Sequence, residues 1–163
     1  MSIPSIDILI AEPDADYALI DSGNGKKLEQ FGKHILVRPE PEAFWKPALP
    51  LKEWGSATAE YISGSSENQG QWKINHSIPD KWQIQYSNLI MSIERSSSRH
   101  VGIFPEQAPQ WDFIREKILN SNRKPAVLNL FGYTGAATIT AAQAGAVVTH
   151  VDASKRAISW AKE

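Results

Sequence analysis

The sequence predicts an α/β protein: a small, mostly β N-terminal domain followed by the first part of a doubly wound sheet. Two patterns lead to this prediction. Residues 17–95 contain short runs that alternate between apolar and polar side chains and are separated by turn signals. Residues 126–151 are typical of a strand, a glycine turn, a helix and a second strand, the repeat from which parallel sheets are built. We expect the mostly β domain at 1–99, a connecting loop and helix at 100–124, and the start of the second domain at 125–163.

The N-terminal strands are predicted from alternation and from the turns between them. Asn24-Gly25 is a strong hairpin signal, because both central residues of a type I′ turn need positive φ. The segment 23–27 lacks the spacing of a phosphate-binding loop and no helix follows it, so a hairpin is preferred. Several prolines make residues 39–50 an irregular crossing, and residues 57–61 fit either one helical turn or a strand. The predicted strands are 6–11, 17–21, 26–31, 34–38, 72–76, 82–86 and 89–95.

Two groups of side chains in this region have more than one interpretation. Asp14 and Asp16 lie in an acidic loop, where carboxylates are usually solvated, although a cation site is the alternative. The aromatic residues Trp72, Trp82 and Tyr86 stand among the strands. We interpret them as packing residues, with stacking platforms for nucleic-acid bases as the alternative.

The C-terminal pattern is more specific. Residues 126–130 form an apolar run after Pro125 and predict a buried strand, and residues 131–135 predict a tight turn. A helix is expected at 134–144 and a second strand at 146–151. Asp152 stands at the end of that strand, twenty positions after Gly132. This spacing matches a Rossmann-like nucleotide-binding unit, in which the acid binds ribose hydroxyls.

The side chains of the turn favour one class of nucleotide. A dinucleotide brings a pyrophosphate close to the backbone, and its turn needs glycine at three set places. Two of those places hold Phe131 and Tyr133, whose side chains would crowd a diphosphate. S-adenosylmethionine (SAM) carries no phosphate and tolerates a fuller turn. The turn therefore favours SAM over a nicotinamide dinucleotide.

At these residues the chain resembles the class I SAM-dependent methyltransferases, and among them the rRNA large-subunit (cytosine-C5)-methyltransferase-like group. The resemblance lies in residues 129–135 (Asn-Leu-Phe-Gly-Tyr-Thr-Gly) and 148–155, and in Trp160-Ala161. Two earlier segments, 21–32 and 100–107, also look like that group. Three motifs in the same order form a fairly specific signal.

The resemblance implies a cofactor-binding surface. Asp152 would accept hydrogen bonds from the ribose, although it could instead only cap the following helix. Residues 100–107 look like the segment that closes over the methionine end of the cofactor, whereas Glu106 alone could be a favourable first-turn charge of the helix predicted at 109–120. The candidate cofactor-binding residues are Phe104, Glu106, Asn129, Phe131, Gly132, Tyr133, Thr134, Gly135, Asp152, Ala153 and Ser154.

The chain carries no recognisable catalytic group for this reaction. Cytosine-C5 methylation needs a thiolate nucleophile, and the chain has no cysteine. The Asn/Asp-Pro-Pro motif of N-methylating relatives is also absent. We expect the catalytic residues beyond Glu163, and an apolar helix face at Ala157, Ile158 and Ala161 that either drives self-association or binds a missing C-terminal part of the same protein. The four histidines lack metal-ligand spacing, so no metal site is predicted.

Composition limits the remaining classes. The 163 residues carry a net charge of −1, so the basic excess typical of nucleic-acid binders is missing, although RNA stays a possible partner through the resemblance. No apolar run reaches the roughly 20 residues of a membrane helix, and no secretory signal is recognisable. We therefore expect a cytoplasmic protein that is not bound to a membrane. The alternatives left open are a nicotinamide-dependent oxidoreductase, a methyltransferase of a small molecule or protein, and a non-catalytic binding module.

Overall fold

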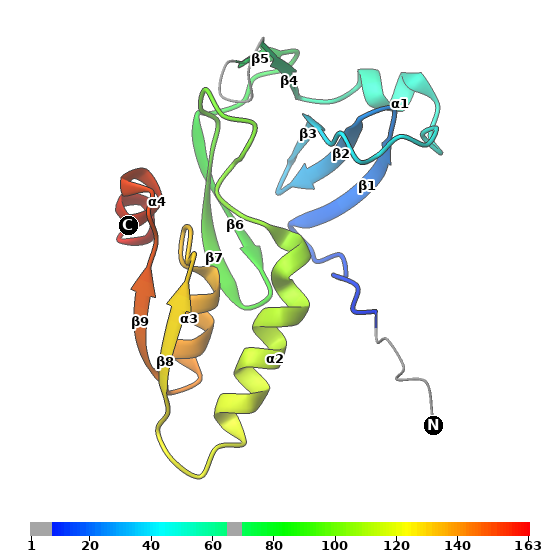
Figure 1. The fold of residues 1–163 in the computed structure, drawn as a ribbon. Helices are drawn as coiled ribbons and strands as arrows, with labels where there is room; N and C mark the ends of the chain where they lie inside the picture. The colour runs from blue at the N-terminus through cyan, green and yellow to red at the C-terminus, as the bar shows by residue number, and fades with distance from the viewer. Residues whose placement is uncertain (1–7, 65–69) are drawn as a thin grey trace. The chain divides into compact units, whose positions relative to one another are not determined.

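The computed structural model describes residues 8–64 and 70–163, and it divides into two compact units (Figure 1). One unit is Pro13–Ile103. The other contains Phe104–Glu163 together with residues 8–12. We describe each unit separately, first the β-rich unit and then the C-terminal unit.

The β-rich unit contains a five-stranded sheet of order β1-β2-β3-β4-β5 and a separate hairpin of β6 and β7. Neighbouring strands of the sheet are antiparallel except β3 and β4, which run parallel. The chain between those two strands holds the short helix α1 (Leu51–Gly55). The strands are β1 (Tyr17–Gly23), β2 (Lys26–Phe31), β3 (His34–Pro39), β4 (Ala59–Ser63), β5 (Gly70–Ile74), β6 (Lys81–Tyr86) and β7 (Leu89–Glu94).

The turn between β1 and β2 is the predicted hairpin. Asn24 and Gly25 both have positive φ, 50° and 74°, as a type I′ turn requires. Of the two structures considered for residues 57–61, the strand is observed, because Ala59 and Glu60 pair with Leu36 and Val37 of β3.

The predicted strand at 6–11 is wrong where it can be examined. Residues 6 and 7 lie outside the described residues, and residues 8–11 are irregular. Ile8, Leu9 and Ile10 are at least two-thirds exposed. Their apolar pattern alone does not form a strand, since a strand needs a partner for its backbone hydrogen bonds.

Aromatic side chains pack the β-rich unit, as predicted. The ring of Tyr17 lies 5.2 Å from the rings of both Phe31 and Tyr86. The indole N–H of Trp82 donates to the carbonyl of Phe31 at 3.1 Å, and that of Trp72 donates to the carbonyl of Ser96. These contacts confirm the interpretation of Trp72, Trp82 and Tyr86 as packing residues.

The acidic loop is more ordered than expected. Asp16 accepts a hydrogen bond from the backbone N–H of Gln85, and Asp14 accepts one from that of Ser87. Both carboxylates therefore bind the β6–β7 hairpin instead of being merely solvated. No group of three potential metal ligands occurs within residues 8–64 and 70–163.

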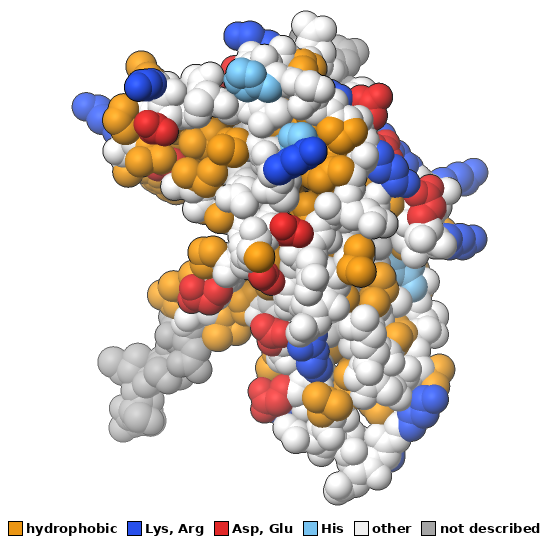
Figure 2. All heavy atoms as spheres, turned by 180° about the vertical axis from the view of Figure 1, so that it is seen from behind, with side chains coloured by type: hydrophobic (Ala, Val, Ile, Leu, Met, Phe, Trp, Pro, Cys, Tyr) orange, Lys and Arg blue, Asp and Glu red, His pale blue; other side chains and the backbone are white. Residues whose placement is uncertain are grey.

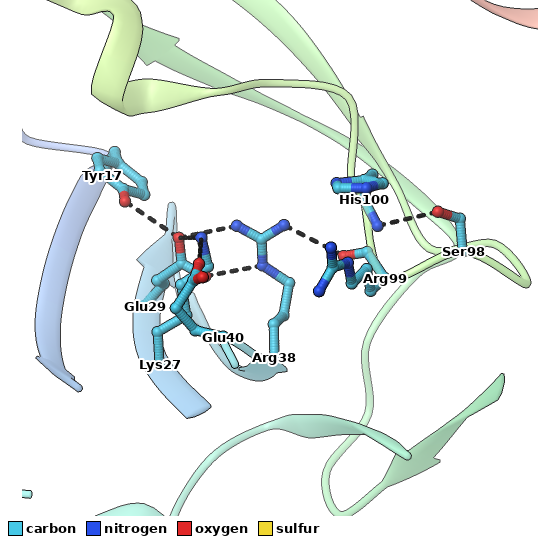
Figure 3. A network of polar contacts seen from close by, with 8 residues as sticks. All are labelled: Tyr17, Lys27, Glu29, Arg38, Glu40, Ser98, Arg99 and His100. Carbon is cyan, nitrogen blue, oxygen red and sulfur yellow. Dashed lines mark hydrogen bonds and ion pairs between the residues drawn. The ribbon is translucent and has the colours of Figure 1, made fainter. Parts of the chain in front are cut away.

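A charged network lies inside the β-rich unit (Figure 3). Glu29 on β2 is fully buried and accepts two hydrogen bonds from the guanidinium of Arg38 on β3, at 2.7 and 2.8 Å. The hydroxyl of Tyr17 and the ammonium of Lys27 also contact this carboxylate. Burial opposes ionisation of Glu29, but the charge and hydrogen bonds of Arg38, together with Lys27 and Tyr17, outweigh it and lower the pKa. The carboxylate is therefore kept ionised within the core.

The C-terminal unit is a parallel pair of strands with helices around it. β8 and β9 pair in register from Ala126 with Val147 to Leu130 with Val151. A small core joins Ile118 of α2 to Ala141 of α3. The elements are η1 (Pro105–Gln107), α2 (Ala108–Leu119), β8 (Ala126–Leu130), α3 (Ala136–Gln143), β9 (Val147–Val151) and α4 (Lys155–Ala161).

One face of the β8–β9 sheet is exposed. Inward positions such as Val127 and Val148 pack against the α2–α3 core, and α3 lies behind the two strands in Figure 1. The opposite positions are 44–60% exposed. They are Leu128, Leu130, Val147 and Val151.

The expected exposed helix face is different in the structure. Ala157 of α4 is buried, and Ile158 and Ala161 are half-buried. The prediction of an uncovered stripe on this helix is therefore wrong at Ala157. The apolar surface that remains open belongs to the sheet, because alternate residues of each strand point away from α3.

Charges of both signs are interspersed on the face of the molecule in Figure 2. No single-sign patch stands out on that face, in keeping with the net charge of −1. Among the described residues, no helix is long and apolar enough to cross a bilayer.

Candidate functional site

The candidate site lies at the carboxyl ends of β8 and β9. The chain leaves β8 at Leu130 and turns at once into residues 131–135, which precede α3. The N–H of Gly132 donates to the carbonyl of Val151 at 3.0 Å, so the turn is joined to the end of β9. The N–H of Gly135 donates back to the carbonyl of Gly132 at 2.9 Å. The turn is thus fixed both to itself and to the neighbouring strand.

The backbone of this turn is unusual. Phe131 and Tyr133 both have positive φ, 58° and 50°, a conformation that L-residues other than glycine rarely adopt. Gly135 has φ of 96°, which favours glycine. The side chain of Phe131 is 89% exposed, whereas the ring of Tyr133 lies 4.8 Å from that of Phe104. Strained backbone of this kind is common at ligand-binding sites.

Gly132 is required by what lies beneath it. A Cβ added at this position would collide with the imidazole of His150 on β9. The absence of a side chain is therefore explained by internal packing, in addition to any approach of a ligand that the sequence suggested.

Asp152 joins the turn to the segment after β9. One carboxylate oxygen accepts the N–H of Tyr133 and the other accepts the N–H of Ser154, both at 2.8 Å. These two hydrogen bonds, that from Ser154 first, lower the pKa of Asp152 below its usual value of 3.8, and the nearby His150 acts in the same direction. Asp152 is therefore ionised at neutral pH.

The alternative role for Asp152, a cap of the next helix, is wrong. The N-cap of α4 is Ser154, whose hydroxyl accepts the N–H of Ala157 at 3.2 Å. Asp152 instead stabilises the residues before that helix, and part of its carboxylate stays accessible.

Three side chains next to the turn are joined by hydrogen bonds that the sequence did not predict. The amide of Asn129 on β8 donates to the hydroxyl of Thr138 on α3 at 2.8 Å. That hydroxyl lies 2.8 Å from Nδ1 of His150 on β9. Nε2 of His150 is buried and has no partner among the described residues. Strand alternation could have placed His150 on the inner face with Asn129, but no local signal indicates that Thr138 joins them.

The remaining candidates are placed as follows. Thr134 is buried in the turn, and Phe104 is half-buried against Tyr133. Glu106 lies in the first turn of η1 and is exposed, so its side chain is free to act as a first-turn charge. Ala153 is exposed beside Asp152.

This arrangement places the candidate residues at the carboxyl edge of a parallel sheet. Such an edge is where open α/β sheets bind their ligands. A strained turn donates a hydrogen bond to an ionised carboxylate, and Tyr133 of the turn packs against the ring of Phe104.

Comparison with known proteins agrees with the class of protein that the sequence predicts. No protein-family model and no curated protein matches the chain. Among solved structures, the chain is similar to a SAM-dependent methyltransferase from Agrobacterium tumefaciens, with 42% identity over 98% of the chain and a TM-score of 0.88. The chain spans about half (51%) of that protein.

Two further structures share the fold at 19% identity. A protein from Streptococcus mutans described as a SAM-dependent methyltransferase gives a TM-score of 0.63, over 91% of this chain and 41% of that protein. A protein named SMU.776, described as a methyltransferase and complexed with SAH, gives a TM-score of 0.56, over 85% of this chain and 37% of that protein. The resemblance to the class I SAM-dependent methyltransferases is confirmed: the chain belongs to this family and corresponds to about half of the Agrobacterium protein.

Proposed function

We propose that this chain is the SAM-binding part of a class I SAM-dependent methyltransferase. The observation that carries the proposal is the position of Asp152 at the end of β9, hydrogen-bonded to the turn after β8. Each carboxylate oxygen accepts one backbone N–H and keeps a second lone pair. Those lone pairs suit the two hydroxyls of a ribose, so the residues present fit this cofactor.

The other residues have positioning roles in this proposal. Ala153 and Ser154 lie next to Asp152, where the adenosine would follow the ribose. The backbone of residues 132–135 would lie along the cofactor, and Phe104 and Glu106 would line its methionine end. SAM supplies the reactive methyl group, and the protein binds and orients it.

A nicotinamide dinucleotide is the weaker candidate. Its pyrophosphate would have to lie against the turn that carries Phe131 and Tyr133, where a bare glycine backbone is needed. A dinucleotide-dependent oxidoreductase is therefore disfavoured as a function of this chain. A binding module without catalysis is the other alternative.

We propose further that the whole protein methylates a base of rRNA in the cytoplasm. This rests on the resemblance of residues 21–32, 100–107 and 129–135 to the rRNA (cytosine-C5)-methyltransferase-like group. A thiolate for transfer to C5 has to come from outside residues 1–163, which contain no cysteine. Small-molecule and protein substrates are the alternatives, and methylation assays with each substrate class distinguish them.

The exposed face of the β8–β9 sheet supports a second element of the proposal. Four exposed apolar side chains lie together on this face: Leu128, Leu130, Val147 and Val151. Contiguous apolar surface of this kind often marks an interaction site. We propose that further polypeptide of the same protein covers it, with self-association as the alternative. Light scattering on the chain alone and on a longer protein separates these possibilities: only self-association makes the chain a dimer.

The cofactor proposal is tested at Asp152. Removal of a charge-assisted hydrogen bond costs about 1.5–3 kcal/mol, so Asp152→Ala should weaken SAM binding by roughly tenfold or more. Calorimetric titration with SAM, and separately with NAD and NADP, measures this. Asp112→Ala, at an exposed carboxylate on α2, is the control and should bind SAM normally. Unchanged SAM affinity in folded Asp152→Ala, or tighter binding of NAD, would contradict the proposal.

A further inference from the structure

The β-rich unit contains a pocket of its own. It has a volume of about 370 Å³ and lies between one face of the sheet and the segment that holds α1. This volume falls within the range of small-ligand sites. None of its lining residues belongs to the candidate SAM site.

The floor of the pocket is set by the strand register. Lys26 and Leu28 lie on the same face of β2, Leu28 pairs with Val37 of β3, and Val37 pairs with Glu60 of β4. Residues that pair directly point to the same side of a sheet. Lys26, Val37 and Glu60 therefore form one surface, with a buried apolar side chain between two charges.

The opposite wall is held in place by one carboxylate. Asp21 accepts the backbone N–H groups of Ala48 and Leu49 and the indole N–H of Trp54, at 2.9–3.2 Å. Burial opposes ionisation of Asp21, but these hydrogen bonds lower its pKa, so the carboxylate is ionised at neutral pH. The indole of Trp54 is thereby fixed as a wall of the pocket before any ligand arrives.

The ion pair between Lys26 and Glu60 at the pocket can be replaced by contacts with a ligand. The ammonium of Lys26 lies 2.6 Å from Oε1 of Glu60, and their side chains are 48% and 22% exposed. Exposed ion pairs contribute little to stability. A ligand that offers an acceptor to Lys26 and donors to Glu60 can replace this contact at small cost.

We propose that the pocket binds a guanine base, with the flat ring beside Trp54. Guanine carries an acceptor, O6, next to two N–H donors, N1 and N2. Lys26 would donate to O6, and the two oxygens of Glu60 would accept the two N–H groups. Adenine and cytosine offer only one amino group on that edge. This inference deepens the proposed function, on which it rests, because it gives the RNA substrate a base-recognition site built from residues other than those that bind the cofactor.

The base could come from a free nucleotide or from single-stranded RNA, and titrations separate the two. The protein is titrated with GMP, IMP and AMP, and with single-stranded hexanucleotides with and without guanine, by calorimetry. IMP lacks the amino group at position 2, so it should bind about tenfold or more weakly than GMP. Binding of the guanine-containing hexanucleotide supports RNA as the source, and binding of GMP alone supports a free nucleotide.

The variant Glu60→Gln tests the assigned contact. It removes one acceptor and should weaken GMP or oligonucleotide binding about tenfold or more, without a change in thermal unfolding. The matched control is Glu53→Gln, at an exposed carboxylate on α1 that does not line the pocket. Lys26→Met should show the same loss as Glu60→Gln.

Equal affinity for GMP, IMP and AMP would overturn the proposal, and so would unchanged guanine binding in Glu60→Gln. Absence of all nucleotide binding would overturn it as well. SAM titration of the same samples keeps the two proposals distinct. Normal SAM binding without guanine binding rejects only the pocket, and the reverse rejects only the cofactor proposal.

Discussion

The two units of this chain differ in how they treat charged and apolar side chains, both of which are unfavourable without a suitable partner. The β-rich unit buries two opposite charges, Glu29 and Arg38, and satisfies them within its own strands. The C-terminal unit leaves apolar side chains such as Leu128 and Val147 exposed on its sheet. The first unit therefore satisfies its buried charges internally, whereas the second presents an apolar sheet face that is open to more polypeptide. Changes at the buried ion pair of the first unit should act on stability, and changes at the turn after β8 in the second should also act on SAM binding.

The largest effect should come from breaking the buried ion pair. Arg38→Met leaves Glu29 charged and without its main partner in the core, which costs about 3–5 kcal/mol of stability. Hydrogen exchange during denaturation should show the loss in β2 and β3, while the exchange of β8 and β9 stays unchanged. Lys27→Met is the control, because Lys27 is a more distant partner, 3.7 Å from Glu29. A loss of stability below about 1 kcal/mol in Arg38→Met would remove the contrast between the units.

A smaller effect, confined to the C-terminal unit, is expected at Gly132. Gly132→Ala forces the new methyl group against His150, and overpacking of this kind costs about 1–3 kcal/mol. SAM affinity should fall together with the stability of the β8–β9 pair. The double variant Gly132→Ala/His150→Ala opens space and should recover part of the loss.

Gly145→Ala serves as the matched control for Gly132→Ala. Gly145 has positive φ but open space around its missing Cβ, so only backbone strain is added there. It should destabilise the C-terminal unit without a specific loss of SAM affinity. If Gly132→Ala behaves no differently from Gly145→Ala, the contact with His150 is not what requires a glycine.

The smallest effect is a pH dependence of the β-rich unit. Burial, and then the charges of Lys33 and Arg95, lower the pKa of His34 below 6.5. The unfolded chain therefore binds a proton that the folded chain does not, and stability should fall as the pH drops below about 6.5. Denaturation of the wild type and of His34→Gln between pH 7.5 and 5 measures this. An equally steep pH dependence in both proteins would show that His34 is not responsible.

Much of the C-terminal unit could be predicted because its signals are local. The strand at 126–130 is observed with the predicted bounds, and Asp152 follows the second strand as expected. The partners of that carboxylate could not be predicted, because the N–H of Tyr133 meets it only after the two strands pair. The Asn129–Thr138–His150 chain was missed for the same reason.

Prediction was weaker where a short apolar run had to be judged without its partner. The run at 6–11 is mostly apolar, as in a strand, yet its described residues pair with no strand, and Ile8, Leu9 and Ile10 remain exposed. Asp14 and Asp16 were expected in solvent because their partners, Ser87 and Gln85, lie about seventy residues away in the chain. In both cases the outcome depends on contacts between residues far apart in the sequence, which a local sequence pattern does not reveal.

The parallel pairing of β3 with β4 has a consequence for how the β-rich unit folds. β1, β2 and β3 are joined by tight turns and can pair with little loss of chain entropy. β4 can join them only after residues 40–58 have crossed from one end of β3 to the other, since parallel neighbours cannot be linked by a hairpin. The β1–β3 meander should therefore form early, and the β4–β5 edge should be the slow step that completes the sheet.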